Sequence, residues 1–87
     1  MDLKDTIQGM TSEDYKDRFI AEYQQVVIRS HKLEDLLKRI KNNETTFKPD
    51  CPLGLLEDQL KAMLIYIRYL EIRAARYEDI NLEEVEI

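Results

Sequence analysis

The segment from residue 59 to residue 73 carries its apolar residues at the spacing of an α-helix. It contains no Gly or Pro, and apolar side chains recur at alternating intervals of three and four residues through and beyond it, which places them on one helical face. This apolar stripe consists of Leu56, Leu60, Met63, Ile67, Leu70, Ala74 and Tyr77. Four more large apolar residues lie off the stripe: Leu64, Ile65, Tyr69 and Ile72. One partner helix covers one face, so the second face predicts self-association.

An earlier segment, residues 11–42, has the same periodicity and predicts a first long helix of about 30 residues, or about 45 Å. Thr11 and Ser12 are the expected helix cap. Basic residues at the other end complement the helix dipole. The apolar side of this helix is expected to contain Tyr15, Phe19, Tyr23, Val26, Val27, Leu33, Leu37 and Ile40, with Ser30 as a small polar member.

Residues 43–51 predict a turn, and residues 52–79 predict the second long helix. Phe47 is expected to tuck under the turn, and Pro52 is suited to the first turn of the second helix, where no N–H is needed. Two helices of similar length joined by about ten residues form an antiparallel hairpin.

The N-terminal residues 1–10 predict a short helix that ends at Gly9. A helix of this length is marginal by itself and must dock on the hairpin. Leu3, Ile7 and Met10 are the side chains expected to make that contact.

The C-terminal residues 80–87 are strongly acidic and predict a solvated tail. Within it, Ile80 and Leu82 are the residues expected to fold back on the hairpin.

These elements predict one all-α domain over residues 1–87. Charged residues make up 36% of the chain, with only two Gly and two Pro, a composition typical of long solvated helices. No apolar run approaches the roughly 20 residues of a membrane span, and the first five residues lack the features of a secretory signal, so a cytoplasmic location is expected. A hairpin of this size without disulfides seldom buries enough surface alone, so we expect a homo-oligomer with binding sites between subunits.

The charge pattern bears on the class of partner. The net charge of −5 argues against binding to duplex nucleic acid. Residues 1–17 and 78–87 are acidic, whereas residues 18–77 hold eleven Lys or Arg against eight Asp or Glu, a local net charge of +3. The middle of the chain is therefore suited to a small anion.

No catalytic constellation is present in the sequence, so an enzyme is not expected. Cys51 and His31 are each the single residue of their type, and together they make neither a zinc site nor a plausible nucleophile pair. No cofactor or metal is predicted.

Two groups of aromatic and basic residues are candidates for ligand binding. In the first helix Tyr15, Phe19 and Tyr23 follow one helical line near the basic residues Lys16, Arg18 and Arg29. Aromatic faces hold nucleobases and guanidinium forks hold phosphates. The alternative is that the rings belong to the core and its edge, with basic side chains extending over them. The second helix alternates Tyr and Arg in a similar way, at Tyr66, Arg68, Tyr69, Arg73, Arg76 and Tyr77.

The combined pattern over residues 12–77 resembles the phage anti-CBASS and anti-Thoeris hairpin-domain family. The residues that carry the resemblance are Asp14 to Phe19, Glu22, Tyr23, Arg29, Lys32, Leu33, Phe47, Pro49, Pro52, Leu55, Leu56, Gln59, Ala62, Met63, Tyr66, Leu70 and Arg73. Only about ten residues follow the hairpin, so the added β region of the anti-Thoeris members is missing, which favours the shorter anti-CBASS branch.

This resemblance implies a cyclic-nucleotide sponge that sequesters cyclic di- or trinucleotide immune signals in the host cytoplasm without cleaving them. It implies a helical oligomer, commonly a hexamer, with ligands bound between subunits. It also implies a stacking aromatic, for which Tyr15 is the candidate. Arg29 or Lys32 is the candidate for the phosphate, and Arg68 or Arg73 for a second site near a symmetry axis.

Two other functions remain open from the residues. The acidic ends favour a protein-interaction inhibitor, such as an anti-CRISPR, that mimics nucleic acid. The second alternative is a helical adaptor that binds no ligand. Stabilisation by cyclic nucleotides would distinguish the sponge from both.

Overall fold

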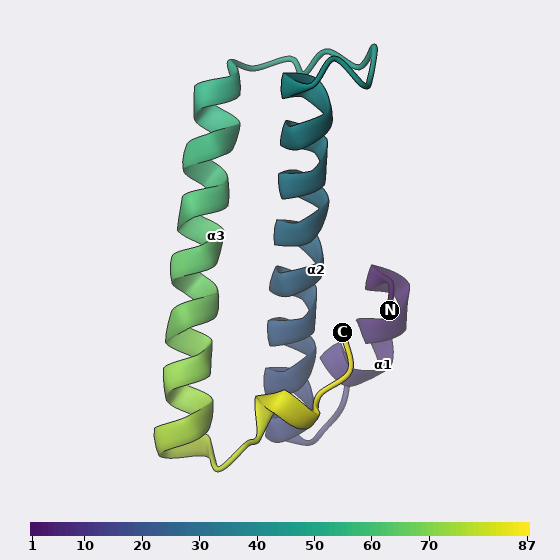
Figure 1. Cartoon of the computed structure of the whole chain (residues 1–87). Helices are drawn as coiled ribbons and strands as arrows, with labels where there is room; N and C mark the ends of the chain where they lie inside the picture. The colour runs from purple at the N-terminus through teal and green to yellow at the C-terminus, as the bar shows by residue number, and fades with distance from the viewer.

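A computed structural model describes all of residues 1–87 and contains helices only, arranged as a long hairpin with both chain ends packed near its base (Figure 1). The molecule measures 42 × 25 × 21 Å. The elements are η1 (Leu3–Thr6), α1 (Ile7–Met10), α2 (Tyr15–Lys41), α3 (Leu53–Arg73), η2 (Ala74–Glu78) and η3 (Leu82–Glu84). The predicted all-α hairpin is therefore confirmed.

The first long helix, α2, begins at Tyr15, and its cap lies after Thr11 and Ser12, the residues expected to cap it. Asp14 caps it, because the Asp14 side chain accepts a hydrogen bond from the Lys16 amide at 2.9 Å. Thr11 instead follows the last residue of α1, and its hydroxyl donates to the carbonyl of Ile7, the first residue of α1. Ser12 supports the new start, since its hydroxyl donates to Asp17 and accepts from the Asp14 amide.

The connection between the long helices differs from expectation at two residues. Pro52 has extended backbone angles and precedes α3 rather than lying in its first turn. The loop reaches beyond the helix ends (Figure 1), and Phe47 on it is 55% exposed. The predicted position of Phe47 under the turn is therefore wrong.

A cluster of buried apolar side chains lies at the end of the hairpin opposite the loop. It contains three almost completely buried residues: Phe19 from α2, Leu70 from α3 and Ala74 from η2. Ile80 and Leu82 pack against this cluster, which confirms that the C-terminal segment folds back. The segment beyond them is not a free tail, because the Gln24 side chain donates a hydrogen bond to the Glu86 carbonyl at 2.9 Å.

A π-helical turn, η2, directly follows α3 and shifts the register of the apolar stripe. Its wider turn rotates later side chains relative to the α-helical stripe. Tyr77, expected on that stripe, is consequently 78% exposed. Asp79 then ends the helix in the left-handed region with φ 53°.

The N-terminal segment approaches the hairpin most closely through two small residues, Thr6 and Gly9. Thr6 is 1% exposed, and its hydroxyl oxygen accepts a hydrogen bond from the Gln25 side chain at 2.9 Å. Gly9 lies inside α1 without a positive φ, and a Cβ there would lie 2.9 Å from the Cβ of Ala21. Ile7 is 60% exposed, so the predicted docking through Ile7 is wrong; Met10 is 39% exposed and Leu3 is half-buried. The helix continues one residue past Gly9 and ends at Met10, within the predicted bounds of residues 1–10.

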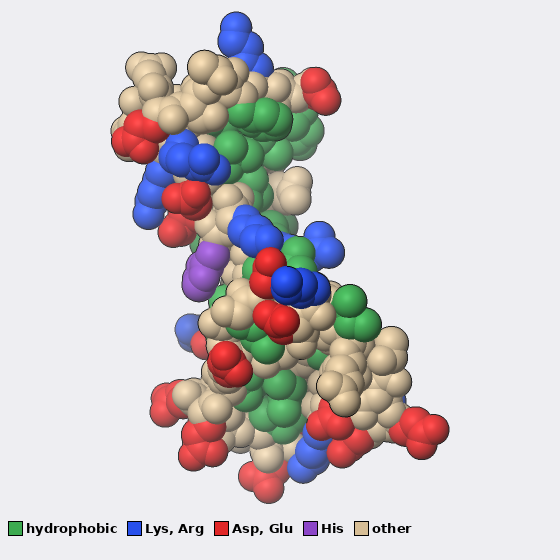
Figure 2. Space-filling view, turned by 90° about the vertical axis from the view of Figure 1, so that its right-hand side faces the viewer, with side chains coloured by type: hydrophobic (Ala, Val, Ile, Leu, Met, Phe, Trp, Pro, Cys, Tyr) green, Lys and Arg blue, Asp and Glu red, His purple; other side chains and the backbone are tan.

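The second apolar face of α3 is uncovered in the single chain. Its four residues Leu64, Ile65, Tyr69 and Ile72 are all exposed. Acidic side chains gather over the lower half of the molecule in Figure 2, where the two chain ends lie in Figure 1. None of the helices is both long and apolar enough to cross a membrane.

Candidate functional site

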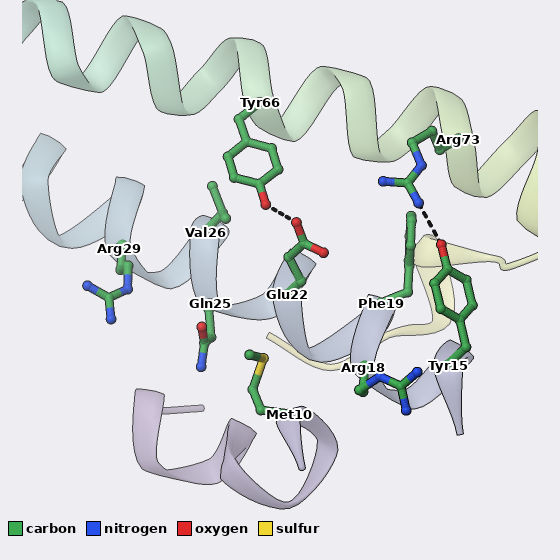
Figure 3. A pocket seen from close by; sticks show the side chains of 10 residues that line it. All are labelled: Met10, Tyr15, Arg18, Phe19, Glu22, Gln25, Val26, Arg29, Tyr66 and Arg73. Carbon is green, nitrogen blue, oxygen red and sulfur yellow. Dashed lines mark hydrogen bonds between the residues drawn. The ribbon is translucent and has the colours of Figure 1, made fainter. Parts of the chain in front are cut away.

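A cleft of about 620 Å³ opens beside the core, between α2 and α3 and next to α1 (Figure 3). It is large enough for a small organic ligand, for which sites of about 300–1,000 Å³ are usual. Its wall is formed by Met10, Tyr15, Arg18, Phe19, Glu22, Gln25, Val26, Arg29, Tyr66 and Arg73.

Most of the polar lining comes from a single face of α2. Tyr15, Arg18, Glu22, Gln25 and Arg29 follow one another at intervals of three and four residues, so they remain on one side of the helix. The facing helix α3 contributes Tyr66 and Arg73, which are seven residues apart and therefore also share a face. The site is thus built on two rigid helices.

Three guanidinium groups make the cleft cationic. Arg73 donates a hydrogen bond to the Tyr15 hydroxyl at 2.6 Å and forms an ion pair with Glu78 at 3.5 Å. Its guanidinium carbon lies 4.9 Å from the centre of the Phe19 ring. Arg18 donates to the Ser12 carbonyl at 2.7 Å. Arg29 is exposed and forms no hydrogen bond or ion pair within the chain. Its full set of donors is available to a ligand.

Two tyrosine rings line the cleft and are partly open to solvent. Tyr15 is 46% and Tyr66 is 42% exposed. Their hydroxyl groups are fixed by carboxylates, since Tyr15 donates to Glu78 at 3.2 Å and Tyr66 donates to Glu22. An anchored hydroxyl holds the ring in place, so each ring offers a preset flat surface.

A family model described as Sequestin matches residues 13–76, well over half of the chain. The chain belongs to the Sequestin family. The match confirms the resemblance to the anti-CBASS and anti-Thoeris hairpin-domain family, which was stated over residues 12–77, and the family name indicates a sequestering protein. The Sequestin match includes every cleft residue except Met10. No curated protein and no solved structure matches the chain.

Four of the residues predicted from the sequence meet at this cleft of the Sequestin hairpin. They are Tyr15, Phe19, Arg29 and Arg73. Phe19 differs from the others because only 2% of it is exposed. Its ring belongs to the core and supports Arg73, so it is not an open stacking surface in the single chain.

Tyr23, Lys32 and Arg68 lie outside the cleft. Eight residues of α-helix rotate Tyr23 by about 80° relative to Tyr15, which directs it towards the core. Burial, with a smaller contribution from Glu71, raises the pKa of Tyr23. Arg68 is exposed on α3 and does not line the cleft.

Lys32 interacts with the N-terminal segment. Its ammonium group lies 3.1 Å from an Asp2 carboxylate oxygen. The Leu3 amide, followed by Lys32, lowers the pKa of Asp2. The chain therefore already supplies Lys32 with an anionic partner.

Arg18 and Tyr66 also line the cleft, and both belong to the aromatic and basic groups named from the sequence. Glu22 and Gln25 were not named as candidates for ligand binding, and the signal for them was the alternation of three and four residues that starts at Tyr15 and runs along α2. The contact of Glu22 with Tyr66 had no such signal, because it depends on how the two helices face each other. No group of three or more His, Cys, Asp or Glu side chains is arranged to hold a metal ion.

Proposed function

We propose that this protein is a phage anti-defence protein that binds cyclic di- or trinucleotide immune signals in the host cytoplasm and sequesters them without cleavage. The observation that carries the proposal is the combination of two exposed tyrosine rings and three guanidinium groups in one cleft. A sequestering role agrees with membership of the Sequestin family.

The ligand chemistry follows from the residues of the cleft. A cyclic oligonucleotide presents flat bases and negatively charged phosphates in a closed ring. Bases stack on aromatic side chains, for which Tyr15 and Tyr66 are available, with about 1–3 kcal/mol for each base. Phosphates accept paired hydrogen bonds from guanidinium forks, and Arg29 has no competing partner in the chain.

The proposal includes assembly of the chain into a homo-oligomer, with a hexamer as the expected form. The cleft is open on one side, and a sponge must bind at low ligand concentration. A Kd of about 1 nM requires about 12 kcal/mol, which an open surface on one hairpin is poorly able to supply. A second copy, held through Leu64, Ile65 and Tyr69 on the exposed face of α3, would close the site. Arg68 and Lys32 are then proposed to act between copies.

Isothermal titration calorimetry with cyclic dinucleotides and cyclic trinucleotides tests the proposal. Arg29→Ala is expected to weaken binding by about 10- to 100-fold, the cost of losing hydrogen bonds to a charged group. Tyr15→Ala is expected to weaken it by a similar factor. Arg76→Ala is the matched control, because Arg76 is exposed and lies outside the cleft.

Two results would contradict the proposal. One is the absence of binding to every cyclic nucleotide tested. The other is an equal effect of Arg29→Ala and Arg76→Ala, which would mean that the cleft is not the site.

A further inference from the structure

Glu22 is the only acidic residue that lines the cationic cleft. It lies on α2 between Arg18 and Arg29, about one turn from the first and about two turns from the second. One of its carboxylate oxygens accepts the hydrogen bond from the Tyr66 hydroxyl. The other carboxylate oxygen accepts no hydrogen bond in the chain (Figure 3).

The Glu22 carboxylate is not neutralised by the arginines around it. None of the ion pairs of the chain includes Glu22, and its only bonded partner is a neutral phenol. An unpaired carboxylate repels phosphate, so a cleft that binds phosphates alone would be better without it. This placement suits a ligand with two regions, one anionic and one that donates hydrogen bonds.

A carboxylate only accepts hydrogen bonds, and it accepts from about four directions. Glu22 uses one of them for Tyr66 and keeps the others for a ligand. A nucleobase that satisfies both carboxylate oxygens must present two neighbouring donors on one edge. Guanine does so with N1–H and the N2 amino group. Adenine and cytosine present one donor beside an acceptor, and uracil presents a single donor between two carbonyl groups.

We propose that Glu22 is a specificity-determining residue that selects cyclic nucleotides containing guanine. The proposal rests on the function proposed above and adds the identity of the base. The arginines bind the phosphates, a tyrosine ring stacks on the base, and the Glu22 carboxylate accepts from the guanine edge. Each site thus discriminates by hydrogen bonds, whereas stacking alone accepts every base.

Two variants separate base recognition from the contact between helices. Glu22→Gln keeps an oxygen that accepts from Tyr66 but replaces the other oxygen by an amide that donates. Glutamine pairs with adenine through one acceptor and one donor, so this variant is expected to reverse the preference. Tyr66→Phe removes the hydroxyl and leaves the Glu22 carboxylate intact.

The experiment measures the Kd of each protein for cyclic di-GMP, cyclic di-AMP and cyclic di-IMP, whose base lacks the N2 amino group. The native chain is expected to bind cyclic di-GMP about 10- to 100-fold more tightly than cyclic di-AMP, with cyclic di-IMP between them. Glu22→Gln is expected to reverse this ratio, through weaker binding of cyclic di-GMP and tighter binding of cyclic di-AMP. Tyr66→Phe is expected to keep a preference for cyclic di-GMP.

The outcomes distinguish this inference from the proposed function. Binding of cyclic di-GMP and cyclic di-AMP with equal Kd, or an equal loss for both ligands in Glu22→Gln, would overturn the inference while the proposed function stands. Absence of binding to all cyclic nucleotides would overturn both.

Discussion

Replacing Gly9 by alanine tests how the N-terminal segment is held against the hairpin. The added Cβ would lie 2.9 Å from the Cβ of Ala21 and 3.4 Å from the Asp17 carbonyl oxygen. Carbon atoms in ordinary contact are about 3.5–4.0 Å apart, so α1 must move away by at least about 0.6 Å. Neither neighbouring atom is the end of a flexible side chain, so the backbone itself must give way.

The expected change in the free energy of unfolding of Gly9→Ala is the difference between two opposing contributions. Overpacking of this kind costs about 1–3 kcal/mol. Alanine in a helix is favoured over glycine by up to about 1 kcal/mol. With the full helix-propensity gain of about 1 kcal/mol, the net effect of Gly9→Ala is a loss of up to about 2 kcal/mol in the free energy of unfolding. Each 1 kcal/mol lowers Tm by about 4–8 °C in a domain of this size.

Gly54→Ala is the matched control. Gly54 lies in the first turn of α3, and a Cβ there meets nothing within 4 Å. The same substitution is therefore expected to stabilise the chain by up to about 1 kcal/mol.

Thermal and urea unfolding of both variants, at one fixed protein concentration, measure these changes. Adding Ala21→Gly to Gly9→Ala removes the close contact, so the loss in the double variant is expected to be smaller than the sum of the two single losses. The reasoning is refuted if Gly9→Ala raises Tm as Gly54→Ala does, or if the two single losses are additive.

Three further predictions concern the core, the N-terminal cap and self-association. Phe19→Ala should lower the free energy of unfolding by about 3–5 kcal/mol in urea titrations, since the ring is buried; a loss below about 1 kcal/mol would contradict its place in the core. Asp2→Asn should be less stable than the native chain at pH 7, because the pKa of Asp2 is lowered from 3.8 in the folded state. The stability that the Asp2 carboxylate contributes is present above pH 3.8 and is lost as the pH falls through the lower folded pKa. Thermal unfolding curves of the two proteins that differ equally at pH 7 and pH 2 would refute this prediction. Ile65→Glu should reduce the sedimentation coefficient, because a charge would be buried at the proposed subunit contact, whereas an unchanged coefficient would place that contact elsewhere.

The hairpin was predictable from the sequence because its signals are local. Apolar residues at intervals of three and four residues, with a break at residues 43–51, require no knowledge of distant contacts. Ile80 and Leu82 were also expected to return to the hairpin, and both pack on the core. Tyr77 could not be placed correctly, because the π-helical turn before it changes the register.

The candidate site was predicted only in part, for a physical reason. Tyr15 and Arg29 stand out by residue type, and both line the cleft. Glu22 and Tyr66 are ordinary residues of charged helices until the packing of α2 and α3 brings them together across 44 positions of sequence. The docking of Gly9 on Ala21 depends in the same way on a close approach between segments, which composition does not reveal.

Thermal unfolding with a panel of cyclic dinucleotides and cyclic trinucleotides, followed by chromatography of the released ligand, tests the central claim most directly. A ligand present at 100 times its Kd stabilises the folded protein by about 2.7 kcal/mol, which corresponds to a rise in Tm of roughly 10–20 °C for this chain length. The account predicts such a rise for at least one cyclic nucleotide and recovery of that nucleotide unchanged after denaturation. An unchanged Tm across the whole panel, or recovery of a cleaved product, would contradict it.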